Sequence, residues 1–600
     1  MQTVELKSSP AAEESLGAAV PKQKVMWIVL LATAITYLGT LQFEFAFDDF
    51  GQILFNPFVK AWRYVPDYFA SSVWKHLAPT SPGNYYRPMF LLLMRINYAI
   101  FTNRPLGWHM AAIALHLTVT WLTFVLVRKL TGDFTVAWLA ALIFGVHPVH
   151  HEVVAWISGM TESLFAIFFV ASFLAYLKSL ENFKKTWIAL SCIFYALALL
   201  SKETAIVLPA LVFAHAWIGR SSGEEENSMG NLRRLGNALI PASYYIPVAF
   251  CYLLQRHKVL SGLGHSISNL SVTEWLLTLP SILLFYIRHW IFPVRLAESY
   301  DLFAQPNLNL LHVVLPAVMV SAIGVAVWLI RGRLGAHSVG QATAWIVIPL
   351  LPALDIFVFG PQELVHDRYF YVPSIGASLL IALGVTRLMK SKREIFGQPL
   401  HVILSGLALT MCLSLLATKA SSFWINDYSL FSRAHQIAPL NATAASSLGA
   451  EMLARGDLAE ADALLEDAYR QHPTDYRIAF NLGRVLYAQH QLAQAVEYTR
   501  QSIALSPNNS DAYVSLGGME LKQGRRADAQ QTMRQAVEKG PFSAPAHTSY
   551  GIVLAINGDC TGAVTQFEAA LALNPGEGLT QRELARCRAS LAPATATKPG

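Results

Sequence analysis

Two adjacent carboxylates, Asp48 and Asp49, stand between phenylalanines directly after the first long apolar segment of the chain. If that segment, residues 25–43, crosses a membrane, the two acids lie at its exit, at the head of a long loop rich in Trp, Tyr and Pro. Carboxylates are costly to desolvate at a lipid boundary, so acids found there usually have a function. We therefore predict that this pair forms a reaction centre.

Two arginines lie on the same loop or just beyond it. Arg87 stands between a tyrosine and a proline, and Arg95 lies inside an apolar run. An unpaired cation is expensive at or within a membrane boundary, so each arginine is expected to face an anion. That anion is either Asp48 or Asp49, which would give the arginines a structural role, or the phosphate of a lipid substrate.

Histidines and glutamates gather in the stretch that follows the third apolar segment. His147 and His151 are four residues apart and could share a helical face, a spacing that suits metal ligands. No third ligand is evident, so we assign no metal, and a packed, hydrogen-bonded histidine cluster that includes His150 is the other interpretation. Glu152 and Glu162 are expected to join the same polar pocket.

Two more polar clusters lie at the ends of apolar segments. Lys202 and Glu203 stand in a short turn, which either places Lys202 over a phosphate or is a membrane-surface turn that caps a helix. Arg368 and Tyr369 open a later apolar segment. An arginine there suits bidentate contact with a phosphate, and its other role would be to extend toward the lipid headgroups.

The elements that position these residues are predicted to be membrane helices. Hydrophobic residues make up 54% of the 600 residues, whereas about 45–50% is usual for a soluble protein. The net charge of +6 comes from short runs of Lys and Arg between apolar segments, as membrane topology predicts, so no nucleic-acid partner is expected. The predicted crossings of the lipid bilayer are residues 25–43, 105–127, 134–146, 163–177, 186–200, 205–218, 235–254, 310–330, 343–359, 370–388 and 400–418.

The distribution of basic residues predicts the sidedness of the chain. With the basic runs in the cytoplasm, the eleven segments alternate correctly only if a further apolar stretch, residues 274–292, does not cross. The loops that carry the residues above then face the exoplasmic side, as does everything after residue 421. That side is the periplasm for a bacterial inner membrane, or the lumen for an endoplasmic reticulum membrane. Residues 1–24 are expected to be a disordered cytoplasmic tail.

The C-terminal third changes to Ala-rich helical sequence in which a Gly, an Ala and a Pro each recur every 34 residues. The recurring residues are Gly449, Gly483, Gly517 and Gly551; Ala461, Ala495, Ala529 and Ala563; and Pro473, Pro507, Pro541 and Pro575. This pattern predicts four tetratricopeptide repeats at residues 444–577, after a connecting half-repeat at residues 421–443 and before a capping helix and tail at residues 578–600. The predicted fold class is all-α: a polytopic membrane helix bundle at residues 25–420, with an exoplasmic loop at residues 44–104, followed by an α-solenoid.

Five short motifs in this order, together with the repeats, resemble the TMTC family, the transmembrane and tetratricopeptide-repeat O-mannosyltransferases. The motifs are Phe47-Asp48-Asp49, Tyr86-Arg87-Pro88, His147-Pro148-Val149-His150, Leu200-Ser201-Lys202-Glu203-Thr204 and Asp367-Arg368-Tyr369. The similarity extends from about residue 25 to residue 575. The resembled family belongs to the GT-C class of multi-spanning glycosyltransferases, which take a sugar from a polyprenyl-phosphate carrier on the exoplasmic side.

The resemblance implies that Asp48 is the catalytic carboxylate, with Asp49 as the second choice. It implies transfer of a sugar, mannose in this family, from a polyprenyl- or dolichyl-phosphate donor to Ser or Thr hydroxyls of a protein held by the repeats. Asp48 would act as a base in an inverting displacement, with cations around the departing phosphate. The predicted substrate-binding residues are Arg87, Arg95, His147, His150, Glu152, Glu162, Lys202, Glu203, Arg368 and Tyr369.

Several points stay open at this stage. No cofactor is assigned, and the second acid would either orient the acceptor or bind a divalent cation. One alternative function is a GT-C transferase with a different sugar, or with a glycan or lipid acceptor. Another is a membrane scaffold without enzymatic activity, which recruits exoplasmic proteins through its repeats.

Overall fold

The computed structural model describes residues 22–76, 83–182, 184–220, 231–389, 391, 393–395 and 397–592. Within these residues the regular secondary structure is helical, apart from one antiparallel pair of two-residue strands, β1 (Glu394–Ile395) and β2 (Gln398–Pro399). The predicted all-α fold class is therefore confirmed. The tail predicted to be disordered lies almost wholly outside the described residues.

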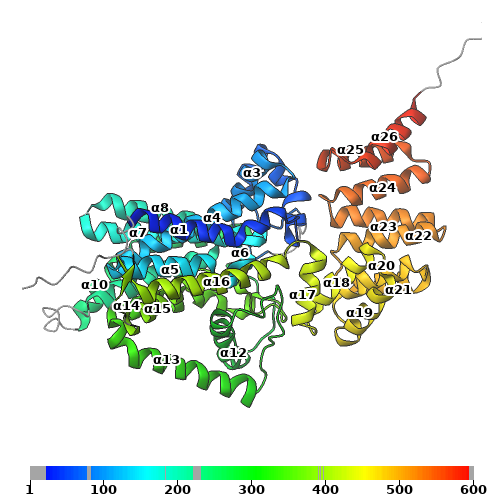
Figure 1. Ribbon diagram of the computed structural model, residues 1–600. Helices are drawn as coiled ribbons and strands as arrows, with labels where there is room; N and C mark the ends of the chain where they lie inside the picture. The colour runs from blue at the N-terminus through cyan, green and yellow to red at the C-terminus, as the bar shows by residue number, and fades with distance from the viewer. Residues whose placement is uncertain are drawn as a thin grey trace, which may run out of the picture.

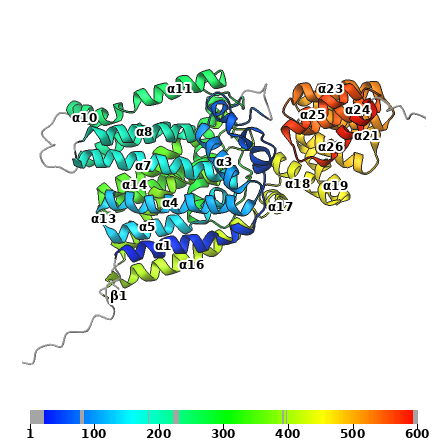
Figure 2. The ribbon, with the colours of Figure 1, turned by 90° about the horizontal axis from the view of Figure 1, so that it is seen from above.

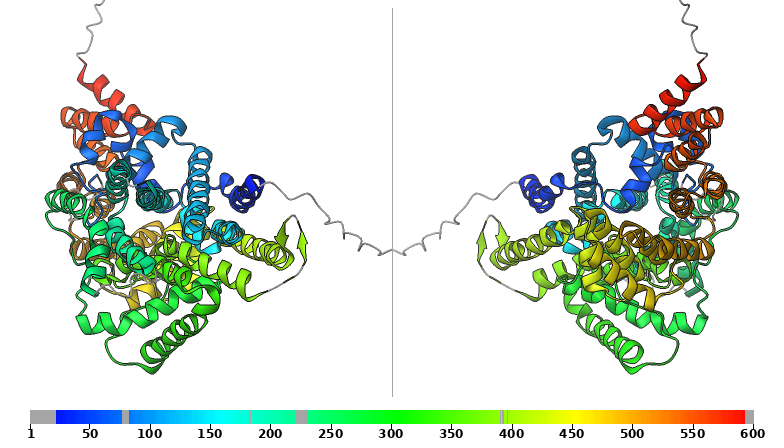
Figure 3. Two further views of the ribbon diagram at one scale, coloured as in Figure 1. Left: turned by 90° about the vertical axis from the view of Figure 1, so that its left-hand side faces the viewer. Right: turned by 90° about the vertical axis from the view of Figure 1, so that its right-hand side faces the viewer.

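The first part of the chain is a bundle of long helices that run side by side (Figure 2) and are seen roughly end-on in Figure 3. Its α-helices are α1 (Lys22–Tyr37), α2 (Val65–Tyr68), α3 (Pro88–Phe101), α4 (Pro105–Thr131), α5 (Phe134–Val146), α6 (His151–Ala155), α7 (Met160–Asn182), α8 (Lys185–Ser201), α9 (Leu208–Arg220), α10 (Asn231–Ser243), α11 (Ile246–Leu260), α12 (Val272–Ile291), α13 (Leu315–Leu334), α14 (Ala336–Leu350), α15 (Pro373–Leu388) and α16 (Leu400–Ser422). Local signals set the helix ends. For example, α4 ends at Gly132, which has a left-handed φ of +69°. The carboxylate of Asp133 then caps the first backbone N–H groups of α5.

Six helical segments of the described chain are long and apolar enough to cross a membrane. They are Lys24–Gln42, Pro105–Thr131, Ile157–Glu181, Leu310–Leu334, Ala336–Val358 and Leu400–Ser422. Two bent pairs, Phe134–Val146 with Pro148–Ala155 and Leu235–Ser243 with Ile246–Leu260, raise the number to eight if each pair is one span. The chain is thus a multi-pass membrane protein, while eleven crossings stay a prediction. α12, in the stretch predicted not to cross, is not one of these segments.

Loops and short helices gather at the end of the bundle that faces the repeats (Figures 1 and 2). The long loop after α1 lies there with α3 and α6, and the solenoid follows beyond it. The loops that the charge pattern assigns to one side of the membrane therefore contribute to the same end of the bundle. Which side of a membrane this end faces stays a prediction.

The C-terminal part is a stack of helix pairs closed by α26 (Gly578–Leu591). The first helices of the four pairs are α18 (Ala442–Arg455), α20 (Tyr476–Ala488), α22 (Ser510–Lys522) and α24 (Ala544–Ile556), and the second helices are α19 (Leu458–Gln471), α21 (Leu492–Leu505), α23 (Arg526–Lys539) and α25 (Cys560–Leu573). The recurring glycine lies where the two helices of a pair meet. At Gly551, for example, an added Cβ would stand 2.6 Å from the ring of Phe567. The predicted tetratricopeptide solenoid is thereby confirmed, whereas its predicted boundaries stay predictions.

A connecting helix, α17 (Asp427–Ile437), joins the last bundle helix to the first repeat and lies against the loop that carries the acidic pair. The backbone N–H of Glu44 donates to the carbonyl oxygen of Ile425 at 3.1 Å. The backbone N–H of Phe47 donates to Oδ1 of Asp427 at 2.7 Å. The start of the first loop and the segment after the last bundle helix are thus hydrogen-bonded to each other.

The solenoid has further contacts with the bundle. The side-chain amide of Asn441 donates to the backbone oxygen of Gln362 at 2.9 Å. Farther along the solenoid, the ring of Phe542, in the turn before α24, meets the ring of Phe58 with centroids 5.5 Å apart. The repeats therefore touch the bundle near their beginning and again at the turn between the third and fourth helix pairs.

Candidate active site

Two cavities adjoin each other at the end of the bundle that faces the repeats. The larger has a volume of about 650 Å³ and the smaller about 90 Å³. Tyr85, Arg87, Glu162, Lys202 and Tyr369 line both of them. Because the cavities share these residues, one bound molecule can occupy the larger cavity and present its end to the smaller one.

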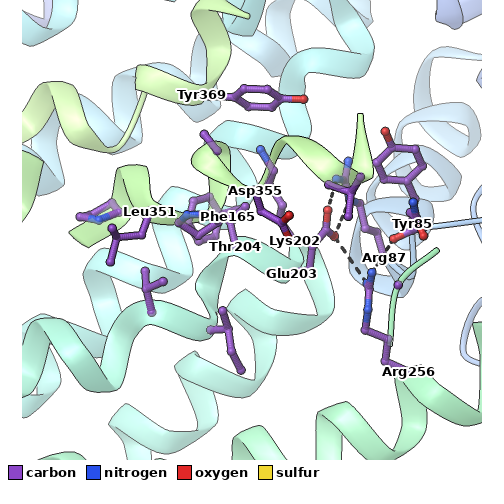
Figure 4. Close-up of a pocket in the computed structure, with 18 of the residues that line it drawn as sticks. Tyr85, Arg87, Phe165, Lys202, Glu203, Thr204, Arg256, Leu351, Asp355 and Tyr369 are labelled. Carbon is purple, nitrogen blue, oxygen red and sulfur yellow. Dashed lines mark hydrogen bonds and ion pairs between the residues drawn. The ribbon is translucent and has the colours of Figure 1, made fainter. Parts of the chain in front are cut away.

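The larger cavity has a charged wall (Figure 4). Nε and Nη2 of Arg87 bind the two carboxylate oxygens of Glu203 at 3.0 and 2.5 Å, and Nη1 of Arg256 lies 4.0 Å from the same carboxylate. Lys202 forms a buried ion pair with Glu162. Much of the remaining lining is apolar and includes Phe165, Ile206, Leu253, Leu351 and Phe357. Arg87 therefore pairs with Glu203 and not with the acidic pair of the first loop.

Asp48 is half-buried and lines the smaller cavity, together with Ser158 and Arg368. Within the described part of the chain, its carboxylate has no hydrogen-bond partner. Burial raises the pKa of Asp48 to about 7, although the positive charge of Arg368 acts to lower it. A carboxylate with free oxygens and a pKa near neutrality is suited to accept a proton from a hydroxyl.

Asp49 differs from its neighbour, because both of its oxygens are occupied. Oδ1 accepts hydrogen bonds from the backbone N–H and the hydroxyl of Ser158 at 2.9 and 2.6 Å, and Oδ2 accepts one from the backbone N–H of Ala46 at 3.2 Å. The side chain is 1% exposed and lines neither cavity. Asp49, the second choice for the catalytic carboxylate, thus fastens the first loop to the segment between α6 and α7.

Arg368 is a further charged residue of the smaller cavity. Its Nη1 and its backbone N–H donate to Oε2 of Glu152 at 3.3 and 3.0 Å. The rings of Trp156 and Tyr369 lie 5.3 and 5.1 Å from its guanidinium carbon. In the described structure the other guanidinium N–H groups make no hydrogen bond, so they are free to bind an anion.

A buried network holds the residue before Arg368. The carboxylate of Asp367 accepts from Nδ1 of His289 at 2.8 Å, from Nε2 of His151 at 3.2 Å, and from the hydroxyl of Tyr300. Burial alone would raise the pKa of Asp367, but the two histidines outweigh it and hold the pKa below its usual value. The network fixes the backbone from which Arg368 projects.

His151, Glu152 and Asp367 are the only described group whose ligand atoms lie close enough together to hold a metal ion. The hydrogen bonds of His151 do not suit a bound metal ion. Nε1 of Trp424 can only donate, and it donates to Nδ1 of His151 at 2.9 Å, so the proton of the neutral imidazole lies on Nε2 and points at Asp367. A metal-bound histidine uses its other ring nitrogen as a donor, which Trp424 prevents here. This cluster is therefore better described as a proton-sharing network.

Three of the predicted pocket residues lie elsewhere. Arg95 donates to a backbone carbonyl of the first loop at 3.0 Å and forms no ion pair with an acid among the described residues. His147 bonds a backbone carbonyl of α12 at 3.0 Å, and His150 bonds the hydroxyl of Ser374 at 2.9 Å. None of the three lines either cavity. His147 and His150 are hydrogen-bonded within the packed interior, and His147 and His151 bind different partners.

The remaining predicted residues come together from six parts of the chain. Asp48, Arg87, Glu162, Lys202, Glu203, Arg368 and Tyr369 line the cavities, and Glu152 holds Arg368. Sequence reasoning missed Arg256, which carried the same signal as Arg87, a cation at the end of an apolar segment. It also missed Trp424, for which no local signal exists, because its contact with His151 joins positions 273 residues apart.

Two family profiles match parts of this chain. One, described as dolichyl-phosphate-mannose-protein mannosyltransferase, matches residues 81–225, in the bundle. The other, described as tetratricopeptide repeat, matches residues 452–500 and 486–549, in the solenoid. Among solved structures, the chain is similar to MamA MSR-1 C2, with 23% identity, 25% of this chain and 87% of that chain covered, and a TM-score of 0.22.

Curated relatives extend the similarity over most of the chain. Human protein O-mannosyl-transferase TMTC1 is 27% identical over 456 residues, with 68% of this chain and 51% of the relative covered. For human TMTC4 the identity is 26% over 480 residues, with 72% and 63% covered, and for mouse TMTC3 it is 26% over 462 residues, with 71% and 49% covered. This chain thus spans less than two thirds of the length of each of these relatives. Together with the order of the motifs and the attached solenoid, these matches confirm the resemblance of this chain to the TMTC family.

Proposed function

We propose that the protein transfers a sugar, mannose, from a polyprenyl-phosphate carrier to Ser or Thr hydroxyls of a protein acceptor. The names of the relatives and of the bundle profile support a mannosyltransferase. The observation that carries the proposal is the half-buried carboxylate of Asp48, which has no hydrogen-bond partner in the described structure and shares a small cavity with Arg368 and Lys202. A base and two cations in one enclosed space match what glycosyl transfer from a phosphate requires.

The larger cavity offers a place for the carrier. Its apolar lining suits a polyprenyl chain, and its charged wall suits the phosphate to which the chain is attached. Lys202 and Arg368 are the cations with donors to spare, since the single side-chain hydrogen bond of Lys202 in the described structure goes to Glu162. Arg87 has two of its donors occupied by Glu203 and contributes mainly charge.

The reaction would be a single displacement. Asp48 takes the proton from the acceptor hydroxyl, whose oxygen forms a bond to the anomeric carbon while the bond from that carbon to the phosphate oxygen breaks. The carrier phosphate leaves as an anion, which Lys202 and Arg368 stabilise, so no acid is needed to protonate it. Attack on the face opposite the phosphate inverts the anomeric configuration.

The test uses the purified full chain in detergent, polyprenyl-phosphate-linked mannose and a pool of exoplasmic proteins. Wild type is compared with Asp48→Asn, which keeps the shape of the side chain but removes the base. Intact-mass spectrometry should show a hexose-sized gain on acceptor protein. The mutant should be slower by about 10²–10⁴-fold, the usual contribution of a general base.

The matched control is Asp67→Asn, which removes one exposed carboxylate from the same loop and should leave the rate unchanged. Transfer with another carrier-linked sugar, or onto a glycan or lipid, would replace the mannose or the protein acceptor in the proposal. If no carrier-linked sugar is transferred and Asp48→Asn leaves partner recruitment intact, the scaffold alternative replaces the enzyme.

A further inference from the structure

The residue directly before Asp48 has an unusual backbone conformation. Phe47 has a φ of +56°, in the left-handed region that residues other than glycine seldom adopt. Such a conformation persists only where the surroundings hold it, and strained residues of this kind recur at active sites. The backbone of Phe47 sets the direction in which the next side chain leaves the loop. Contacts that fix the conformation of Phe47 therefore also orient the side chain of Asp48.

One hydrogen bond on Phe47 comes from outside the bundle. Its backbone N–H donates to Oδ1 of Asp427 at 2.7 Å, a bond between residues 380 positions apart. A hydrogen bond to an ionised carboxylate is stronger than one between neutral groups. The ring of Phe47 also packs on Trp156 and Phe431, with centroids 5.8 and 5.7 Å apart. Phe431, like Asp427, belongs to α17.

Asp427 is itself held firmly. Asn426 caps α17 through a bond from the backbone N–H of Ser429 at 3.0 Å, and Trp424, just before it, donates to the buried His151. The residues of α17 that face inward, among them Leu430 and Phe431, are buried. α17 also packs against α18, the first helix of the repeats. Asp427 therefore has the rigidity that a positioning role requires.

We propose that Asp427 is a positioning residue for Asp48, through which the helix that begins the solenoid holds the catalytic base in place. The proposal rests on the function proposed above. It assigns to α17 a part in the active site: Asp427 orients the loop without touching the substrate, whereas Asp48 meets the acceptor hydroxyl. A repeat array attached this way would be needed for the chemical step as well as for holding the acceptor.

The test compares the full-length variants Asp427→Ala and Asp427→Asn with wild type. Alanine removes the acceptor oxygen, whereas asparagine keeps an oxygen that can accept the bond from Phe47. We expect Asp427→Ala to lower kcat by about 10²-fold, as small misplacements of a catalytic group do, with the KM for the carrier-linked sugar unchanged. Asp427→Asn should restore most of the lost kcat. The control is Asp467→Ala, which removes an exposed acid from α19.

A second readout does not depend on activity. Hydrogen-exchange mass spectrometry of the peptide that spans residues 44–50 should show faster exchange of the Phe47 amide in Asp427→Ala, and wild-type exchange in Asp427→Asn and Asp467→Ala. Unchanged exchange or unchanged kcat in Asp427→Ala would overturn the proposal, as would an Asp427→Asn variant as slow as alanine. If Asp48→Asn is inactive while Asp427→Ala is not, the positioning role fails and the transferase stands. If wild type transfers no sugar, the proposed function fails, and with it the positioning role.

Discussion

The carboxylates of Asp48 and Asp49 are adjacent in the chain but have different tasks in the structure. Asp49 accepts three hydrogen bonds and fastens the loop, so its removal would leave the backbone N–H groups of Ser158 and Ala46 without partners in a buried site. Asp48 accepts none within the described residues and faces a cavity. The sequence could predict that the pair matters, but not which acid is free, because that depends on Ser158, more than a hundred residues away.

The pH dependence of the reaction should report the state of Asp48. In the proposed reaction its carboxylate form accepts the proton, and burial raises its pKa to about 7 while Arg368 acts to lower it. Below that pH the fraction of ionised Asp48 falls about tenfold per unit, so we expect kcat/KM to rise with pH and to level off above about 7. The measurement is a pH profile of sugar transfer under limiting donor.

The variant Arg368→Gln checks the cause of this profile. It removes the charge that lowers the pKa of Asp48, so the inflection should move to higher pH, whatever the loss in absolute rate. A profile that already levels off near pH 4, the range of an ordinary carboxyl group, would mean that Asp48 is not the group that titrates.

At the scale of elements, the period of 34 residues sufficed to predict the solenoid, because each repeat must place a small residue where its two helices cross. One of the tight crossings gives a stability prediction. At Gly551 an added Cβ would stand 2.6 Å from the buried ring of Phe567, whereas at Gly518 it would meet nothing within 4 Å. We expect Gly551→Val to destabilise the last helix pair by about 1–3 kcal/mol through overpacking.

The matched variant Gly518→Val should cause no such loss. Hydrogen-exchange mass spectrometry of the full chain measures the difference, since protection should fall in α24 and α25 for Gly551→Val alone. Equal protection in the two variants would show that the helices of the last repeat can move apart at no cost.

Other elements were beyond the reach of the sequence. Lys202 stands at the end of α8, where spacing alone allowed either a phosphate site or a capping turn, and the structure pairs it with Glu162 beside both cavities. The histidines after α5 had the spacing of metal ligands, but the chain turns there before α6, so His147 and His151 have different neighbours. Short-range patterns fix helices, whereas the partners of buried polar groups depend on contacts between distant segments.

At the scale of the whole molecule, the distribution of charge predicted that the reactive loops share one side, and they do gather at the end of the bundle that meets the repeats (Figure 1). The number of crossings is harder to predict from composition, because several apolar helices are short and two pairs are bent by 52° and 48°. The docking of the solenoid onto the first loop could not be predicted at all, since it joins residues from opposite ends of the chain.

Under the proposed function, that docking has a consequence for where sugars are added. The solenoid touches the bundle both near its beginning, where Asn441 binds Gln362, and at the contact between Phe58 and Phe542, so it is held at two points. An acceptor bound along a surface held in this way would lie at a fixed distance from Asp48. We therefore expect the modified hydroxyls to lie at a constant spacing from the segment that the repeats recognise. Site mapping on acceptors cross-linked to the solenoid would reveal this spacing. Sites scattered at random distances would show that the solenoid does not hold the acceptor at a fixed distance from Asp48.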